Sequence, residues 1–120
     1  MPVASGECVK VTTEDRVAVV TIDHRPVNAL NRQTMQELDA VIEGLRGDTA
    51  VKVIILTGAG SLAFVAGADI KEVSQLTSPK EAQEVSAHGQ AVFMKLQKLG
   101  KPVIAAITGV CLGGGLELAL

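Results

Sequence analysis

The fold is decided by residues 101–120, KPVIAAITGVCLGGGLELAL, in which an apolar run meets three consecutive glycines. The run at 102–107 is short and apolar, which predicts a buried strand. The glycines at 113–115 lead into a second apolar run, which predicts the start of a helix. Glu117 is the only charge from residue 102 to 120, so the stretch approaches the length of a membrane span. The proline, the glycines and the carboxylate favour a buried strand and helix over a span.

Outward from this segment, strands and helices alternate. Asn31 is a candidate helix N-cap, because its side-chain oxygen can accept from the exposed N–H groups of a first turn. Gly47 is expected to end that helix in the left-handed conformation. Apolar spacing predicts an edge strand at 9–11, a turn at 14–16, a central strand at 17–22, a helix at 31–47, a strand at 51–57, a short helix at 68–75 and a longer helix at 79–99. This order favours an α/β layer fold with strands sandwiched between helices.

The composition indicates a globular protein of one domain and gives no sign of nucleic-acid or membrane binding. The chain has 120 residues, 48% of them hydrophobic, which allows one domain with a core of Val, Ile, Leu and Ala. The formal net charge is −2 without a basic block, so nothing indicates nucleic-acid or anionic-membrane partners. Cys8 and Cys111 lie outside any metal-type spacing, which favours reduced thiols in an intracellular protein. Without a signal peptide, a cytoplasmic location is expected, or the mitochondrial matrix if a transit peptide has been removed.

Three glycine-containing segments could carry chemistry. Residues 58–63, GAGSLA, fit a dinucleotide-binding pattern, but 64–67 reads as continuing loop where that pattern needs a helix. Residues 64–72, FVAGADIKE, and 109–118, GVCLGGGLEL, both place small residues just before a predicted helix. Backbone N–H groups there are unpaired and approachable, so two such helix starts that converge would form an oxyanion hole. Glu117 follows the triple glycine closely enough to supply a carboxylate beside it.

Four motifs in order carry a resemblance to a known family. They are Asn28-Ala29-Leu30, residues 66–71 (AGADIK), residues 101–106 (KPVIAA) and residues 113–119 (GGGLELA). Their order and spacing resemble the enoyl-CoA hydratase/isomerase (crotonase) family, most closely its trans-2-enoyl-CoA hydratases. The likeness covers nearly the whole chain, from about Val9 to Leu120.

The resemblance implies a fold, an activity and a site. The fold is the ClpP/crotonase-like spiral of β-β-α units, and the activity is that of a lyase of fatty-acid β-oxidation that adds water to trans-2-enoyl-CoA. No cofactor is implied beyond the CoA of the substrate, no metal is expected, and the partner copies would form a trimer or a hexamer. The implied site residues are the N–H groups of Ala68 and Gly114 as the oxyanion hole, Glu117 as one of two acid/base glutamates, and Val27, Ala29, Ala66, Ile70 and Lys71 around CoA, with Lys71 nearest the phosphates.

The resemblance also leaves alternatives open. Family members are more than twice as long, and the second glutamate would lie past Leu120. We therefore expect residues 1–120 to be the N-terminal part of a single domain and an incomplete enzyme with uncovered apolar faces. An enoyl-CoA isomerase, or a non-catalytic module that binds CoA, remains an alternative. Among the other polar residues, His24 and His88 are expected to be non-catalytic, Asp69 to cap the loop or helix in which it lies, and Glu72 to be solvated.

Overall fold

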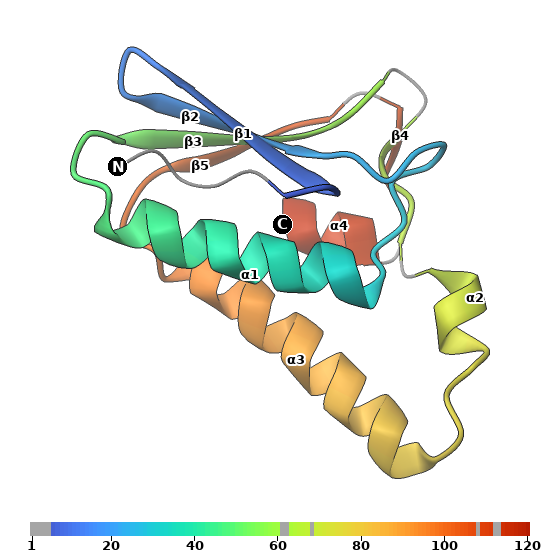
Figure 1. Cartoon of the computed structure of the whole chain (residues 1–120). Coiled ribbons are helices and arrows are strands. Elements are labelled where there is room, and N and C mark those ends of the chain that lie inside the picture. The colour runs from blue at the N-terminus through green and yellow to red at the C-terminus, as the bar shows by residue number, and fades with distance from the viewer. Residues whose placement is uncertain (1–5, 61–62, 68, 108, 112–113) are drawn as a thin grey trace.

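The computed structural model describes residues 6–60, 63–67, 69–107, 109–111 and 114–120. A four-stranded sheet in the order β1-β2-β3-β5 forms one layer, and helices cover one of its faces (Figure 1). A second, two-stranded sheet of β4 and β6 lies at one end. The elements are β1 (Val9–Glu14), β2 (Val17–Ile22), α1 (Arg32–Gly47), β3 (Val53–Gly58), β4 (Ala63–Val65), α2 (Ile70–Val73), α3 (Pro79–Gln97), β5 (Val103–Ala106), β6 (Val110–Cys111) and α4 (Gly114–Ala119).

The N-terminal hairpin forms as the sequence predicts. β1 pairs with β2 in antiparallel register, from Val9 opposite Ile22 to Glu14 opposite Val17. The two-residue loop between them, Asp15 and Arg16, takes positive φ values of 51° and 68°. That conformation matches the right-handed twist of the flanking strands in a tight hairpin. The predicted positions of an edge strand at β1 and a central strand at β2 are both confirmed.

The sheet is covered on one face by the described helices, so the prediction of strands sandwiched between helices is wrong for this part of the chain. β2 and β3 both alternate between half-buried and buried side chains along their length. The buried set, including Val20, Ile22, Ile54 and Leu56, packs against α1 and the C-terminal half of α3. On the edge strand β5, Ile104 remains 54% exposed. Two-residue periodicity, with one face in the core, is what a sheet covered on one side requires.

Helix α1 begins as predicted and ends differently. Asn31 caps it, with Oδ1 accepting from the backbone N of Thr34 at 2.8 Å. Gly47 stays helical, and the chain leaves the helix at Asp48 with a φ of −87°, so the left-handed ending is wrong. The carbonyls at this end have another partner, because Lys101 Nζ donates to the oxygens of Leu45 (2.5 Å) and Asp48 (2.7 Å). A left-handed glycine is therefore not needed to satisfy them.

The segment predicted as loop at 64–67 contains a short strand. β4 pairs with β6, and its three residues are all buried. The predicted short helix shrinks to the four residues of α2, and the longer helix keeps its start at Pro79 under the N-cap Ser78. Within the described ranges, no helix combines the length and apolarity needed to cross a membrane.

Candidate functional site

Two strands that are distant in sequence bring two glycine-containing segments together. β4 and β6 pair in parallel, with Ala63 opposite Val110 and Val65 opposite Cys111. The carboxyl ends of neighbouring parallel strands open at the same edge of a sheet, so the chain that follows β4 lies beside the chain that follows β6. We call the described part of that region the amide edge: Ala66, Gly67, Asp69, Gly114 and Gly115.

Gly115 sets how closely α4 approaches this edge. A Cβ atom placed on Gly115 would lie 1.9 Å from the carbonyl oxygen of Val65 and 2.7 Å from its carbonyl carbon. The neighbouring atoms belong to backbone, which cannot rotate away as a side chain would. The third glycine of the triple run is therefore required by the contact between the first turn of α4 and the end of β4.

The loop before α1 runs beside the amide edge and is hydrogen-bonded to it. The backbone N of Ala66 donates to Val27 O at 3.1 Å. Leu30 N donates to Gly67 O at 2.7 Å, and Asp69 N donates to Leu30 O at 3.0 Å. The residues on both sides of position 68 are thus tied to the single residue Leu30.

Asn28 lies at the centre of this loop and is completely buried. Its Nδ2 donates towards the carbonyl oxygens of Ala59 (3.1 Å), Ala63 (3.0 Å) and Phe64 (3.1 Å). Its Oδ1 accepts from the backbone N of His24 at 3.1 Å. An amide has both donors and an acceptor, so one side chain satisfies groups from two loops and a strand.

The structure describes the predicted site residues to different extents. Ala68 lies outside the described residues. Gly114 begins α4, and Glu117 is three residues further along the same helix, which is nearly one turn. Ile70 and Lys71 belong to α2. The side chains of Glu117, Ile70 and Lys71 lie outside what the structure describes, so their predicted roles stay predictions.

The structure describes the three remaining residues that the resemblance assigns to CoA, and their roles stay predictions. Val27 is 37% exposed. Ala29 is half-buried, and its carbonyl oxygen is 2.7 Å from His24 Nδ1. Ala66, which belongs to the amide edge, is also half-buried, and its backbone N donates to Val27 O. Asn28, Leu30 and Gly115 complete the site, and sequence reasoning gave none of them a role of its own.

Glu72 does more than the sequence predicted. Its Oε1 accepts from the backbone N of Arg32 at 2.7 Å, so it caps the first turn of α1 and is not simply solvated. This contact ties α2 to α1. Asp69 behaves as expected, because it directly precedes α2 and its Oδ1 accepts from Glu72 N at 3.3 Å. His88 is exposed on α3.

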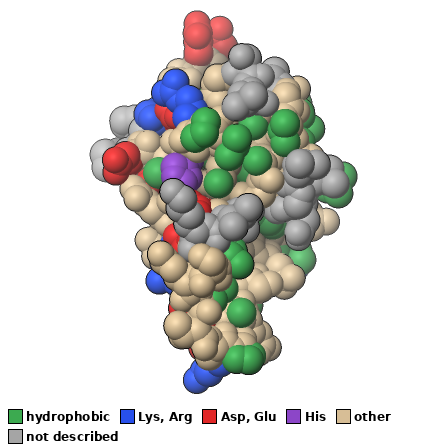
Figure 2. All heavy atoms as spheres, turned by 90° about the vertical axis from the view of Figure 1, so that its right-hand side faces the viewer, with side chains coloured by type: hydrophobic (Ala, Val, Ile, Leu, Met, Phe, Trp, Pro, Cys, Tyr) green, Lys and Arg blue, Asp and Glu red, His purple; other side chains and the backbone are tan. Residues whose placement is uncertain are grey.

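Charged groups gather beside the loop at 23–30. Asp23 accepts from Lys10 Nζ at 2.8 Å and from Arg25 Nε at 2.9 Å. These hydrogen bonds, from Lys10 and then Arg25, lower the pKa of Asp23. In Figure 2, which views the end of the molecule where α2 and β4 lie, basic side chains and a histidine adjoin a gathering of hydrophobic side chains. This face therefore offers both apolar and cationic contacts to a ligand.

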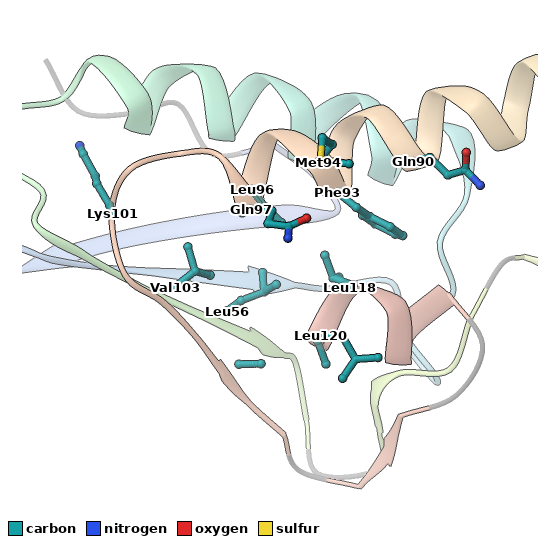
Figure 3. A pocket seen from close by; sticks show the side chains of 12 residues that line it. Leu56, Gln90, Phe93, Met94, Leu96, Gln97, Lys101, Val103, Leu118 and Leu120 are labelled. Atoms are coloured by element: carbon teal, nitrogen blue, oxygen red, sulfur yellow. The ribbon is translucent and has the colours of Figure 1, made fainter.

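Several hollows flank α3, and two of them touch elements of the site. One, of about 690 Å³, opens between α3, β5 and the C-terminal end of α4, where Phe93 and Leu118 face each other (Figure 3). It lies at the opposite end of α4 from Gly114 and so apart from the amide edge. The other, of about 450 Å³, adjoins Leu30 and has a rim that includes Glu72 and Glu84.

Among the residues described, no group of three or more His, Cys, Asp or Glu side chains could hold a metal ion.

The arrangement suits polarisation of a carbonyl group. The first turn of α4 leaves backbone N–H groups without helical partners, and Gly114 and Gly115 carry no side chain that would keep a ligand oxygen away from them. Donors of this kind, fixed in advance by a rigid scaffold, stabilise negative charge that develops on an oxygen.

Comparisons with known proteins agree with this geometry. Residues 12–120 match the family model described as enoyl-CoA hydratase/isomerase. The short-chain-enoyl-CoA hydratase of Clostridium acetobutylicum is 47% identical over 108 residues, which are 89% of this chain and 41% of that protein. The crotonyl-CoA hydratase of Syntrophomonas wolfei is 44% identical over the same shares of the two chains.

Solved structures give the same picture. A structure titled as an enoyl-CoA hydratase/carnithine racemase from Magnetospirillum magneticum has a TM-score of 0.89 at 37% identity, over 96% of this chain and 44% of that one. An enoyl-CoA hydratase structure from Bacillus anthracis has a TM-score of 0.90 at 31% identity, over 94% and 44% of the two chains. This chain thus spans less than half the length of the relatives it matches.

Proposed function

The chain belongs to the enoyl-CoA hydratase/isomerase family, and from this premise we propose that it is the thioester-polarising part of a trans-2-enoyl-CoA hydratase. The observation that carries the proposal is the parallel pairing of β4 with β6, together with the close contact of Gly115 in α4 with Val65 at the end of β4. The relatives with the two highest identities above are named as hydratases of short enoyl-CoA thioesters.

The chemistry needs the groups that this edge offers. Addition of water to the conjugated double bond puts hydroxyl on the β-carbon and a proton on the α-carbon, through a state with negative charge on the thioester oxygen. In our proposal the N–H groups of Ala68 and Gly114 stabilise that oxygen. Glu117 takes part in the transfer of protons between water and substrate. No cofactor is needed beyond the CoA that forms part of the substrate.

In the same proposal CoA lies along the loop before α1. Val27, Ala29 and Ala66 contact the CoA, and α2 adds Ile70 and Lys71, with the ammonium group of Lys71 near the phosphates. Replacement of Lys71 by Met should weaken CoA binding, and the effect should shrink as salt screens the charge. Lys52→Met, on an exposed lysine before β3, is the matched control.

The test of the function is hydration of crotonyl-CoA. The reaction is monitored through the loss of absorbance of the conjugated thioester. Glu117→Gln should lower kcat by about 10²–10⁴-fold, the usual contribution of a general acid or base. Glu14→Gln, at the exposed tip of the β1–β2 hairpin, should leave kcat unchanged. Equal rates for Glu117→Gln and wild type would remove Glu117 from the mechanism. Binding without turnover in the wild type would favour a non-catalytic CoA-binding module.

We also propose that copies of the protein associate, as a trimer or a hexamer. Large apolar side chains stay exposed in β5, just after β5 and in β6: Ile104 at 54%, Ile107 at 49% and Val110 at 40%. Exposed apolar side chains that gather in one patch mark interaction sites in proteins. Light scattering that reports a monomer at micromolar concentration would contradict this part of the proposal.

A further inference from the structure

Asn28 makes contacts that a residue needed only for a turn would not make. Its side chain is completely buried, and its backbone has a φ of 55°, a left-handed conformation that asparagine tolerates better than most residues. The Nδ2 group lies 3.0–3.1 Å from the carbonyl oxygens of Ala59, Ala63 and Phe64. Two of those carbonyls belong to β4, the strand that delivers the chain to the amide edge.

The backbone on each side of Asn28 extends this contact to the edge itself. Val27 accepts from Ala66 N, and Leu30 bonds to both Gly67 O and Asp69 N. The path from the Asn28 amide to the amide edge is therefore short and made of hydrogen bonds. The space around the amide is also tight, since a Cβ on Gly58 would lie 2.8 Å from Nδ2 and 2.1 Å from Phe64 O.

We propose that Asn28 is a positioning residue for thioester polarisation: it fixes β4 and the loop at 27–30 relative to each other, and so aims the backbone donors that follow β4. The inference rests on the proposed function and adds a residue that does not touch the substrate. Its amide is suited to the task, because its two N–H donors are shared among three backbone acceptors and its carbonyl oxygen accepts from one backbone donor in a buried site.

Two substitutions separate the amide from the backbone conformation. Asn28→Gly keeps access to the left-handed conformation and removes the amide. Asn28→Asp keeps the shape, but it turns a carboxylate oxygen towards three carbonyl oxygens that need a donor. Leu45→Ala is the control for general loss of stability, since Leu45 is buried in the last turn of α1 and bonds to none of these groups by its side chain.

The measurement is the infrared carbonyl band of ¹³C-labelled crotonyl-CoA bound to the full-length protein, together with kcat and KM for hydration. In the wild type and in Leu45→Ala the band should shift to lower frequency on binding. In both Asn28 variants the shift should fall to less than about half, and kcat should fall about 10–100-fold with a change in KM below about threefold, as expected when donors are displaced by a fraction of an ångström.

The outcomes distinguish this inference from the function on which it rests. Folded Asn28 variants whose band shift and kcat equal those of Leu45→Ala would overturn the inference and leave the proposed function standing. Loss of folding in both Asn28 variants, while Leu45→Ala still folds, would assign Asn28 to stability alone and would also overturn it. A wild-type protein that neither binds nor hydrates crotonyl-CoA would refute the proposed function and this inference together.

Discussion

Replacement of Gly115 by Ala should disturb the amide edge more than its single methyl group suggests. The added Cβ would lie 1.9 Å from Val65 O, whereas real Cβ atoms essentially never approach closer than 3.0 Å. The first turn of α4 and the end of β4 must therefore separate by at least about 1.1 Å along that line. Both partners are backbone, and β4 is held in turn by β6, so no flexible side chain can absorb the movement.

This separation has a structural and a functional cost. Overpacking of a close contact in a core typically destabilises by about 1–3 kcal/mol. The movement also displaces the N–H groups at the start of α4 from the segment that follows β4. A misplacement of about 1 Å can cost about 10²-fold in rate, and loss of one oxyanion donor about 10²–10³-fold. We expect Gly115→Ala to lower kcat for crotonyl-CoA hydration by about 10²-fold or more.

The assay pairs thermal unfolding with hydration kinetics and includes a second glycine. Gly47 lies in the last turn of α1, and a Cβ there would meet nothing within 4 Å. Gly47→Ala should therefore keep full activity and gain up to about 1 kcal/mol from reduced chain entropy. If Gly115→Ala matched Gly47→Ala in both unfolding temperature and kcat, the close approach of α4 to β4 would not exist as described.

Three further predictions concern the scaffold. The carboxylate of Glu37 accepts from the backbone N of Cys8 at 2.8 Å. Burial acts to raise the pKa of Glu37, but its hydrogen bonds outweigh burial and lower the pKa below 4.5. Its contribution to stability is then present above pH 4.5 and lost as pH falls through the lower folded value, so Glu37→Gln should flatten the acid limb of stability measured by urea unfolding. Lys101→Met should cost about 1–3 kcal/mol and speed amide exchange at the end of α1, because the carbonyls of Leu45 and its neighbours lose a charged donor; unchanged exchange would contradict this. Gly89→Ala, inside α3 where a Cβ meets nothing nearer than 4.0 Å, should raise the unfolding temperature by a few degrees, and a decrease would show that α3 packs more tightly there.

Local signals made much of the fold predictable. The apolar period located the strands of the four-stranded sheet and both long helices. The cap at Asn31 depends on a hydrogen bond to Thr34, only three residues further along the chain. The hairpin turn at Asp15 and Arg16 is equally local. Each of these features is determined by neighbours in the chain, which a single sequence displays directly.

Features made by distant partners were not predictable in this way. β4 and β6 have three and two residues, too few for an alternation to be recognised, and they exist because they pair with each other. Gly47 stayed helical because Lys101, distant in sequence, supplies the cap. Glu72 was expected to be solvated, but it bonds to Arg32, forty residues away. Short-range patterns hold no information about such contacts.

In the candidate site, too, local patterns were predictable from the sequence, whereas contacts between distant residues were not. Sequence motifs identified both segments of the amide edge, because small residues before a helix are a local pattern. What aims them is not local, since the Asn28 amide reaches carbonyls 31 to 36 residues away. Gly58 and Gly115 act on the same strand, where each leaves room for a carbonyl oxygen that a Cβ would displace. The position of β4 thus depends on the Asn28 amide, which binds its carbonyl groups, and on Gly58 and Gly115, whose lack of a side chain leaves room for those groups. A site whose donors are backbone groups depends on this kind of restraint, because no rotamer change can re-aim a peptide N–H once its strand has moved.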